Sequence, residues 1–203
     1  QNLQLDGAML DRLLSSAEQL PIAYVCIVGG EPLDASIVEQ NLRLVHDHPR
    51  TRFLICTSGE PEIGPELGRS LGALRNLTLL VSFEGLPSTH KSIRPRGSFE
   101  QACATLDTYR SYSRSICGAS VTLRTNNWHE ATSREFLEQV SRAGAQYFVY
   151  SPCETVAGRP MLSPDRQALA LDRLAELSAA SRALIFTYPF GQILGQRIAP
   201  ARR

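Results

Sequence analysis

Residues 24–33 read YVCIVGGEPL, from Tyr24 to Leu33, an apolar run that passes directly into two glycines, a glutamate and a proline. The apolar run at 22–28 predicts a short parallel strand that is buried on both faces. Glycines let another molecule approach the backbone closely, and proline helps to end a strand. The stretch therefore predicts a strand whose carboxyl end lies against something outside the chain.

The same alternation of apolar strands and amphipathic helices continues along the 203 residues. Further strands are predicted at 52–57, 77–82, 117–123, 147–152 and 183–188, and helices at 8–19, 34–47, 63–75, 98–113, 132–143 and 164–181, with a long loop before the helix at 98. This order predicts parallel βα units with right-handed crossovers in a single domain over 1–203. Both an open doubly wound sheet and a full or partial (β/α) barrel fit the order. In either architecture the chemistry is expected at the carboxyl ends of the strands.

Composition and charge exclude several classes of protein. The chain is 43% hydrophobic, with a formal charge of +1, which favours an ordinary packed core and gives no signal for nucleic acid or an anionic membrane. No stretch approaches the ~18 consecutive apolar residues of a membrane span. Five dispersed cysteines indicate reduced thiols in a cytoplasmic protein and no metal-binding spacing. Cys26 and Cys56 are expected to be small core residues, and Cys153 is the one cysteine expected to face a cavity.

Polar or glycine-rich residues follow almost every predicted strand. These strand ends carry GGEP (29–32), TSG (57–59), SFEG (82–85), the polar series Ser120, Thr122 and Arg124, and YSPC (150–153). A packed core does not require such residues at so many strand ends. Because the carboxyl ends of parallel strands share one edge, these motifs predict one binding site there.

In this order, GGEP, TSG and SFEG resemble the strand-end motifs of radical SAM enzymes. The segment after SFEG contains His90 and IRPRG (93–97), which is similar to the H-(x)n-R-x-x-G pattern of these enzymes. Residues 122–140 also resemble the corresponding part of a bacterial subgroup of the family. The resemblance covers about residues 5–190. It implies an α/β fold, a partial (β/α)6 TIM-like barrel of parallel strands with outer helices and its first strand missing, and S-adenosylmethionine (SAM) lying across the strand tops.

The resemblance also implies a role for individual residues. The methionine amino group of SAM would meet the GGEP backbone and Glu31, and its carboxylate would meet Ser82 and Arg96, with Arg94 as the alternative. The ribose would lie near two hydroxyl side chains of the strand at 117–123. The implied cofactor-binding residues are Gly29, Gly30, Glu31, Pro32, Thr57, Ser82, Glu84, Arg96, Ser120 and Thr122. No catalytic residue is identified, and His90 is the histidine expected nearest the site.

One feature departs from the family pattern. The CxxxCxxC loop, whose three thiolates hold a [4Fe-4S] cluster, has no counterpart in the chain. Because GGEP resembles the second strand of the family, we expect the missing loop to precede Gln1 and further residues to follow Arg203. Whether those residues hold cysteines for an auxiliary cluster stays open. The implied activity is reductive cleavage of SAM to a 5′-deoxyadenosyl radical that takes hydrogen from an unidentified substrate. Flavodoxin or ferredoxin would be the electron donor, and the chain alone is expected to be inactive.

Two other classes of function remain open. The chain could be a SAM-binding or interaction module without a cluster, or an unrelated α/β enzyme whose glycine-rich loops bind phosphate. Against the second alternative, neither GxGxxG nor GxxxxGK[ST] follows any predicted strand.

Overall fold

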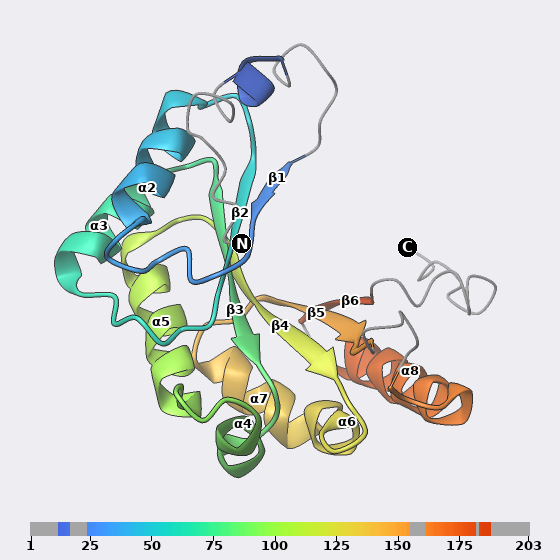
Figure 1. Cartoon of the computed structure of the whole chain (residues 1–203). Helices are drawn as coiled ribbons and strands as arrows, with labels where there is room; N and C mark the ends of the chain where they lie inside the picture. The colour runs from blue at the N-terminus through green and yellow to red at the C-terminus, as the bar shows by residue number, and fades with distance from the viewer. Residues whose placement is uncertain (1–11, 17–23, 155–160, 182, 188–203) are drawn as a thin grey trace.

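A six-stranded parallel sheet forms the centre of the computed structural model, which describes residues 12–16, 24–154, 161–181 and 183–187. The strands are β1 (Val25–Ile27), β2 (Phe53–Thr57), β3 (Leu77–Phe83), β4 (Cys117–Leu123), β5 (Tyr147–Pro152) and β6 (Leu184–Thr187), and their order in the sheet is their order in the chain. In a doubly wound sheet, the order in which the chain adds strands reverses at one point of the sheet. The sheet does not do so and does not close, so the prediction of a partial barrel is confirmed (Figure 1).

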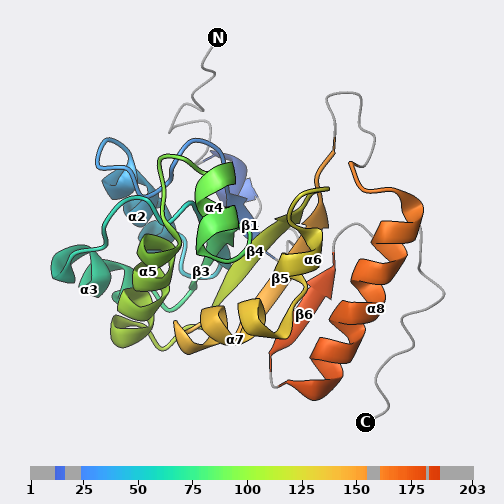
Figure 2. The same cartoon turned by 90° about the horizontal axis from the view of Figure 1, so that it is seen from below.

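Helices connect successive strands and cover the outer side of the curved sheet (Figure 1). They are α2 (Val38–Asp47), α3 (Pro65–Ala73), α4 (Pro87–Ile93), α5 (Phe99–Tyr112), α6 (Trp128–Ala131), α7 (Arg134–Arg142) and α8 (Pro164–Ala180), and residues 12–16 are also helical. Helix α8 lies beside β6 at one edge of the sheet (Figure 2). In the part of the chain that the structure describes, no helix is long and apolar enough to cross a membrane.

The hydrophobic core lies between the sheet and these helices. Ile55, Leu79 and Cys117 stand in register on β2, β3 and β4, and each is fully buried. The alternate residues of the strands face the other, open side of the sheet, where Tyr24, Val28 and Phe186 are exposed. Apolar burial therefore stabilises one face of the sheet, and the open face remains accessible to a ligand.

The prediction that the first strand is buried on both faces is wrong. Strand β1 spans Val25–Ile27, and Cys26 is exposed because it lies on the open face. Residues 22 and 23 lie outside the described part of the chain. Cys56 on β2 is only half-buried, so neither cysteine is the core residue that the apolar run suggested.

The segment predicted as a long loop before residue 98 contains helix α4, which begins with Pro87 in its first turn. Proline favours this position because its missing N–H would have no partner there. Trp128 begins the four-residue helix α6 and packs against the core. These short helices follow the carboxyl ends of β3 and β4 (Figure 1), so they border the predicted site.

Candidate functional site

Glu31 joins the ends of the first two strands. Its Oε1 accepts hydrogen bonds from the Thr57 hydroxyl at 2.6 Å and the Leu33 N–H at 3.1 Å, and its Oε2 accepts from the Ser58 N–H at 2.8 Å and the Ser58 hydroxyl. A carboxylate offers about four lone-pair positions, and four donors occupy them here. GGEP and TSG therefore form one hydrogen-bonded unit, a pairing that the sequence did not predict.

The two glycines before Glu31 have backbone conformations that other residues rarely adopt. Gly29 has φ +90° and Gly30 has φ +55°, which lie in the region that glycine enters without a steric penalty. Both are exposed, and a Cβ placed on either would meet no atom within 4 Å. The backbone here is open to the close approach of a ligand. Pro32, by contrast, is buried, and its carbonyl accepts from the Asn41 side chain at 2.8 Å.

At Gly59, the glycine of TSG, close packing against α5 leaves no room for a side chain. A Cβ at this position would lie 2.8 Å from the Cα of Ala102 on α5. Thr105 of the same helix donates to the Gly59 carbonyl at 3.3 Å. This glycine therefore lets α5 pack against the end of β2, and it acts on the site by fixing that strand end.

Glu84, at the end of β3, is a buried carboxylate held by two arginines. Its side chain is 2% exposed, its Oε1 lies 2.9 Å from Arg94 Nε, and its Oε2 lies 3.7 Å from Arg124 Nε. The two arginine side chains are 29% and 35% exposed. The two guanidinium groups outnumber the single carboxylate that they contact, and each guanidinium keeps further N–H donors for a ligand.

Asn127 holds the ends of β3 and β4 together. Its amide nitrogen donates to the carbonyls of Glu84 at 2.7 Å and Thr122 at 2.9 Å, and its Oδ1 accepts from the Arg124 N–H at 2.6 Å. Asn127 was not among the predicted site residues, although asparagine side chains near a strand end often bond the local backbone.

A row of hydroxyl side chains crosses the open face below these arginines. Ser82 on β3 and Ser120 on β4 are partners in the register, and Thr122 on β4 is the partner of Ser151 on β5. All four are half-buried. Ser82, Ser120 and Thr122 were predicted as site residues. Ser151 was not, although the alternation in YFVYSP places it on the same face as Val149.

Other predicted residues lie elsewhere. Arg96 is exposed in the segment after α4, whereas Arg94, the alternative, contacts Glu84. His90 is close to Glu84, whose N–H donates to its Nδ1 at 3.4 Å, but it is fully buried between Phe83 and Phe99. Burial, and then the nearby Arg94, lower the pKa of His90 to about 4. His90 is therefore a neutral packing residue near neutral pH, and it does not face a ligand.

The described residues do not fit a [4Fe-4S] cluster. Among them, no group of three or more histidine, cysteine, aspartate or glutamate side chains could hold a metal ion, whereas such a cluster needs thiolate ligands. The same residues do fit a zwitterion with hydroxyl groups. They provide an open glycine backbone beside Glu31, two partly exposed arginines and a row of hydroxyl side chains.

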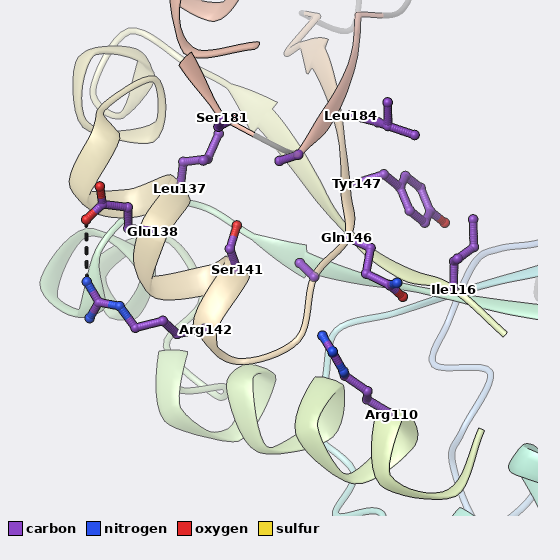
Figure 3. Close-up of a pocket in the computed structure, with 12 residues that line it drawn as sticks. Arg110, Ile116, Leu137, Glu138, Ser141, Arg142, Gln146, Tyr147, Ser181 and Leu184 are labelled. Carbon is purple, nitrogen blue, oxygen red and sulfur yellow. Dashed lines mark hydrogen bonds and ion pairs between the residues drawn. The ribbon is translucent and has the colours of Figure 1, made fainter. Parts of the chain in front are cut away.

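A pocket of about 790 Å³ lies at the opposite end of the strands (Figure 3). Arg110, Ser141, Gln146, Tyr147 and Leu184 are among its lining residues. Arg142 at its rim pairs with Glu138 at 3.4 Å. None of the strand-end residues described above lines it, and the amino ends of parallel strands are not where this type of fold binds its substrate.

Comparisons with known proteins place this arrangement in a wider context. No protein-family model matches the sequence, and no curated protein matches it. Solved structures do. SuiB from Streptococcus suis matches with a TM-score of 0.69 and 12% identity over 100% of this chain and 48% of SuiB. For anSMEcpe with bound AdoMet (SAM), the TM-score is 0.65 and the identity 11%, over 96% of this chain and 57% of that one.

A radical SAM methyltransferase from Sphaerobacter thermophilus matches with a TM-score of 0.59 and 16% identity, over 89% of this chain and 56% of that protein. SuiB has also been solved bound to SAM. The chain spans about half the length of these proteins. At such low identities the likeness concerns the fold. It confirms the predicted resemblance: the chain has the partial-barrel fold of radical SAM enzymes.

Proposed function

We propose that this chain is the SAM-binding core of a radical SAM enzyme. The observation that carries the proposal is the hydrogen-bonded unit of Glu31, Thr57 and Ser58 beside the open backbone of Gly29 and Gly30. It stands at the same sheet edge as Glu84, which follows β3 and pairs with Arg94 after α4 and with Arg124 after β4. Ammonium, carboxylate and ribose are the polar groups of SAM, and each finds a complementary group along this edge.

The ammonium group of SAM would lie against Gly29 and Gly30. Backbone carbonyls accept hydrogen bonds from an ammonium group, and the positive φ angles leave this backbone uncovered. Because four donors already occupy the Glu31 carboxylate, its contribution would be mainly electrostatic attraction. Thr57 would add a backbone contact, and Pro32 would fix the end of the loop.

The carboxylate of SAM would lie against Ser82 and Arg94. Arg94 donates a hydrogen bond from Nε to Glu84, which leaves its two terminal nitrogens to bind a carboxylate in a bidentate manner. The resemblance to radical SAM enzymes implied that Arg96 binds the carboxylate, with Arg94 as the alternative. We favour Arg94 because it is anchored at the end of β3, whereas Arg96 is exposed. Glu84 would position Arg94, and Ser120 and Thr122 would face the ribose.

Cleavage of SAM to a 5′-deoxyadenosyl radical is proposed only for an assembly that supplies the thiolates of a cluster. The described residues do not fit that cluster, so the role proposed for this chain is to bind and orient SAM. A flavodoxin or ferredoxin as electron donor and a cytoplasmic location remain predictions.

We further propose a peptide as the substrate. SuiB has been solved bound to the precursor peptide SuiA, and anSMEcpe has been solved with AdoMet and the Cp18Cys peptide. The open face of this chain supports the proposal, because exposed Tyr24 and Phe186 lie at its two edges, and between them Ser151 has a hydroxyl group that is not assigned to SAM. Apolar contacts and hydroxyl groups suit an extended peptide.

Isothermal titration calorimetry with SAM and with decarboxylated SAM tests the proposal. We expect the chain to bind SAM about 10- to 100-fold more tightly, since a charge-assisted hydrogen bond contributes about 1.5–3 kcal/mol. Arg94→Gln should bring this ratio close to one. Arg69→Gln, at an exposed position on α3, should leave it unchanged.

Comparing two ligands on one variant separates a lost contact from a general loss of folded protein. If Arg96→Gln removes the preference for SAM and Arg94→Gln does not, the assignment of the carboxylate to Arg94 is wrong. If the folded chain binds neither compound, the proposed function itself is wrong.

A further inference from the structure

Two cysteines from adjacent strands meet on the open face of the sheet. Cys26 of β1 and Cys56 of β2 are 30 positions apart in the sequence, and their sulfur atoms are 3.6 Å apart. We propose that Cys26 and Cys56 form an oxidisable dithiol, in which a peroxide converts the two thiols into a disulfide that joins β1 to β2. This site is independent of the proposed cofactor.

The surroundings of the other cysteines differ. Cys117 is buried in the core, where its thiol faces the Gly144 carbonyl at 3.4 Å. Cys103 is half-buried on α5, and Cys153 lies beyond the end of β5, where its thiol faces the carbonyl of Glu154. Among the described cysteines, a sulfur-to-sulfur contact is found only between Cys26 and Cys56, so an oxidant would find a second thiol within reach only there.

The two thiols are unequally accessible, which gives them different roles. Cys26 is exposed and Cys56 is half-buried. Burial, and then the neighbouring Cys26, raise the pKa of the Cys56 thiol to about 12. Cys56 therefore keeps its proton in the reduced chain and must release it as it attacks Cys26, and Cys26 is the thiol that solvent and oxidants reach first.

The reaction balances with hydrogen peroxide as the oxidant. The Cys26 sulfur attacks one peroxide oxygen, the O–O bond breaks, and Cys26 becomes a sulfenic acid while one water leaves. The Cys56 sulfur then attacks the Cys26 sulfur, the S–O bond breaks, and a second water leaves with the Cys56 proton. Two thiols lose two electrons and two protons in total, and one peroxide becomes two waters.

The position of β1 in the sheet allows the bond to close. Cys26 is the register partner of Leu54, and Cys56 lies two residues further along β2, so the two α-carbons are not directly opposite. With ~4.8 Å between strands and ~3.3 Å of rise per residue, this offset puts the two α-carbons ~8 Å apart. A disulfide needs α-carbons within about 7 Å, so β1 must move toward Cys56. Among the described strands, β1 is the shortest, at three residues, and it pairs only with β2, so fewer strand contacts oppose its movement than at a central strand.

The disulfide would lie directly beneath the unit that holds Glu31. Cys26 stands three residues before Gly29, and Cys56 precedes Thr57, which donates to Glu31. Joining these two strands would change the spacing between the GGEP and TSG ends. Oxidation of the two cysteines would therefore alter the candidate site through residues 27–28 and the backbone between Cys56 and Thr57.

Peptide mapping of the oxidised chain tests the proposal. Trypsin should release Cys26 in residues 13–43 and Cys56 in residues 53–69, and the other three cysteines lie in other tryptic peptides. The folded chain is treated with hydrogen peroxide, its remaining thiols are blocked with N-ethylmaleimide, and the monomer is digested without reductant. We expect peptides 13–43 and 53–69 joined, lighter by two hydrogens than their sum, and separated by dithiothreitol.

Three variants make the test specific. Cys26→Ser should leave Cys56 reduced, so that N-ethylmaleimide modifies it once the chain is unfolded, and Cys56→Ser should stop the reaction at a Cys26 sulfenic acid that dimedone traps. Cys103→Ser should keep the joined peptides. If the folded wild-type chain instead yields unlinked peptides, with Cys26 blocked by N-ethylmaleimide or oxidised beyond the sulfenic acid, the dithiol proposal is wrong. This readout requires no SAM, so failure of the proposed function would not affect it.

Discussion

Thr57 donates its hydroxyl proton to a Glu31 carboxylate oxygen 2.6 Å away, and the two residues are 26 positions apart in the sequence. Thr57 is 1% exposed, so little water competes for this bond. The Thr57 hydroxyl also accepts from the Gly59 N–H at 3.1 Å. The GGEP loop is thereby fixed to β2 before any ligand arrives, which favours a preorganised site.

The Glu31–Thr57 bond should contribute measurably to stability. Thr57→Val removes the hydroxyl but keeps the shape, and Glu31→Gln removes the charge that all four donors share. We expect each variant to lose about 1.5–3 kcal/mol of unfolding free energy in urea denaturation, because the acceptor is charged and partly buried. The double variant should lose less than the sum, by at least about 0.5 kcal/mol. Strict additivity would show that the two side chains act independently.

Because of the backbone conformation of Gly29, replacing it with alanine should lower the unfolding free energy even though the new side chain would clash with no other residue. Gly29→Ala places a methyl group in open space, but at φ +90° the residue remains strained, and we expect a loss of about 1–2 kcal/mol in the same assay. Gly64→Ala is the matched control. A Cβ at Gly64 also meets no atom within 4 Å and its φ of −66° suits alanine, so Gly64→Ala loses only the preference for glycine over alanine at the N-cap of α3. Equal stability losses in the two variants would argue against backbone strain at Gly29.

Asn127 should be essential for the junction of β3 and β4. Asn127→Ala leaves the Glu84 carbonyl, the Thr122 carbonyl and the Arg124 N–H without the partner that each now has. Each buried polar group left in this way costs about 1–3 kcal/mol, and we expect a total loss of about 3 kcal/mol or more. The neighbouring Asn126 is exposed, so Asn126→Ala should change stability by less than about 0.5 kcal/mol. Comparable effects of the two variants would contradict this role.

The sequence predicted most of the strands because burial leaves a direct signal in it. Strands β4 and β5 occur at the predicted residues, 117–123 and 147–152, since their helix-facing residues are apolar and their ends carry polar or turn residues. Helix α4 was missed because PSTHKSI has no amphipathic period, and only Pro87 at its start hints at a helix. The open face of β1 could not be predicted either, because apolar residues occupy it as well.

The site was predicted as a set of strand ends, but its pairings were not. The order of GGEP, TSG and SFEG predicted that these motifs share one sheet edge. In the structure, Glu31 accepts hydrogen bonds from Thr57 and Ser58 at that edge. The choice between Arg94 and Arg96 depends on where α4 ends, and this helix was unknown from the sequence. Arg94 is the residue at its C-terminus, and its side chain turns back to Glu84. A contact between a helix end and a strand end, such as that of Arg94 with Glu84, depends on tertiary packing, and no local sequence pattern predicts it.

His90 should make the folded chain sensitive to acid. Its pKa in the folded chain is about 4, compared with 6.5 when it is unperturbed, mainly because of burial, and Arg94 lowers it further. The unfolded chain therefore binds one more proton than the folded chain between these two pH values. Because of His90 alone, the unfolding free energy should fall by up to roughly 1.4 kcal/mol per pH unit as the pH drops from 6.5 toward 4, a loss of about 3 kcal/mol in total.

Carboxylates also titrate near pH 4, so the test requires a difference between variants. His90→Gln keeps an acceptor for the Glu84 N–H and removes the titrating imidazole. Urea denaturation at several pH values between 6.5 and 4 should show a shallower pH dependence for this variant than for the wild type. His46→Gln is the control, because His46 is exposed on α2, and it should keep the wild-type slope. A wild-type slope in His90→Gln would mean that His90 already carries its proton in the folded chain, and its place between Phe83 and Phe99 would then require a compensating charge.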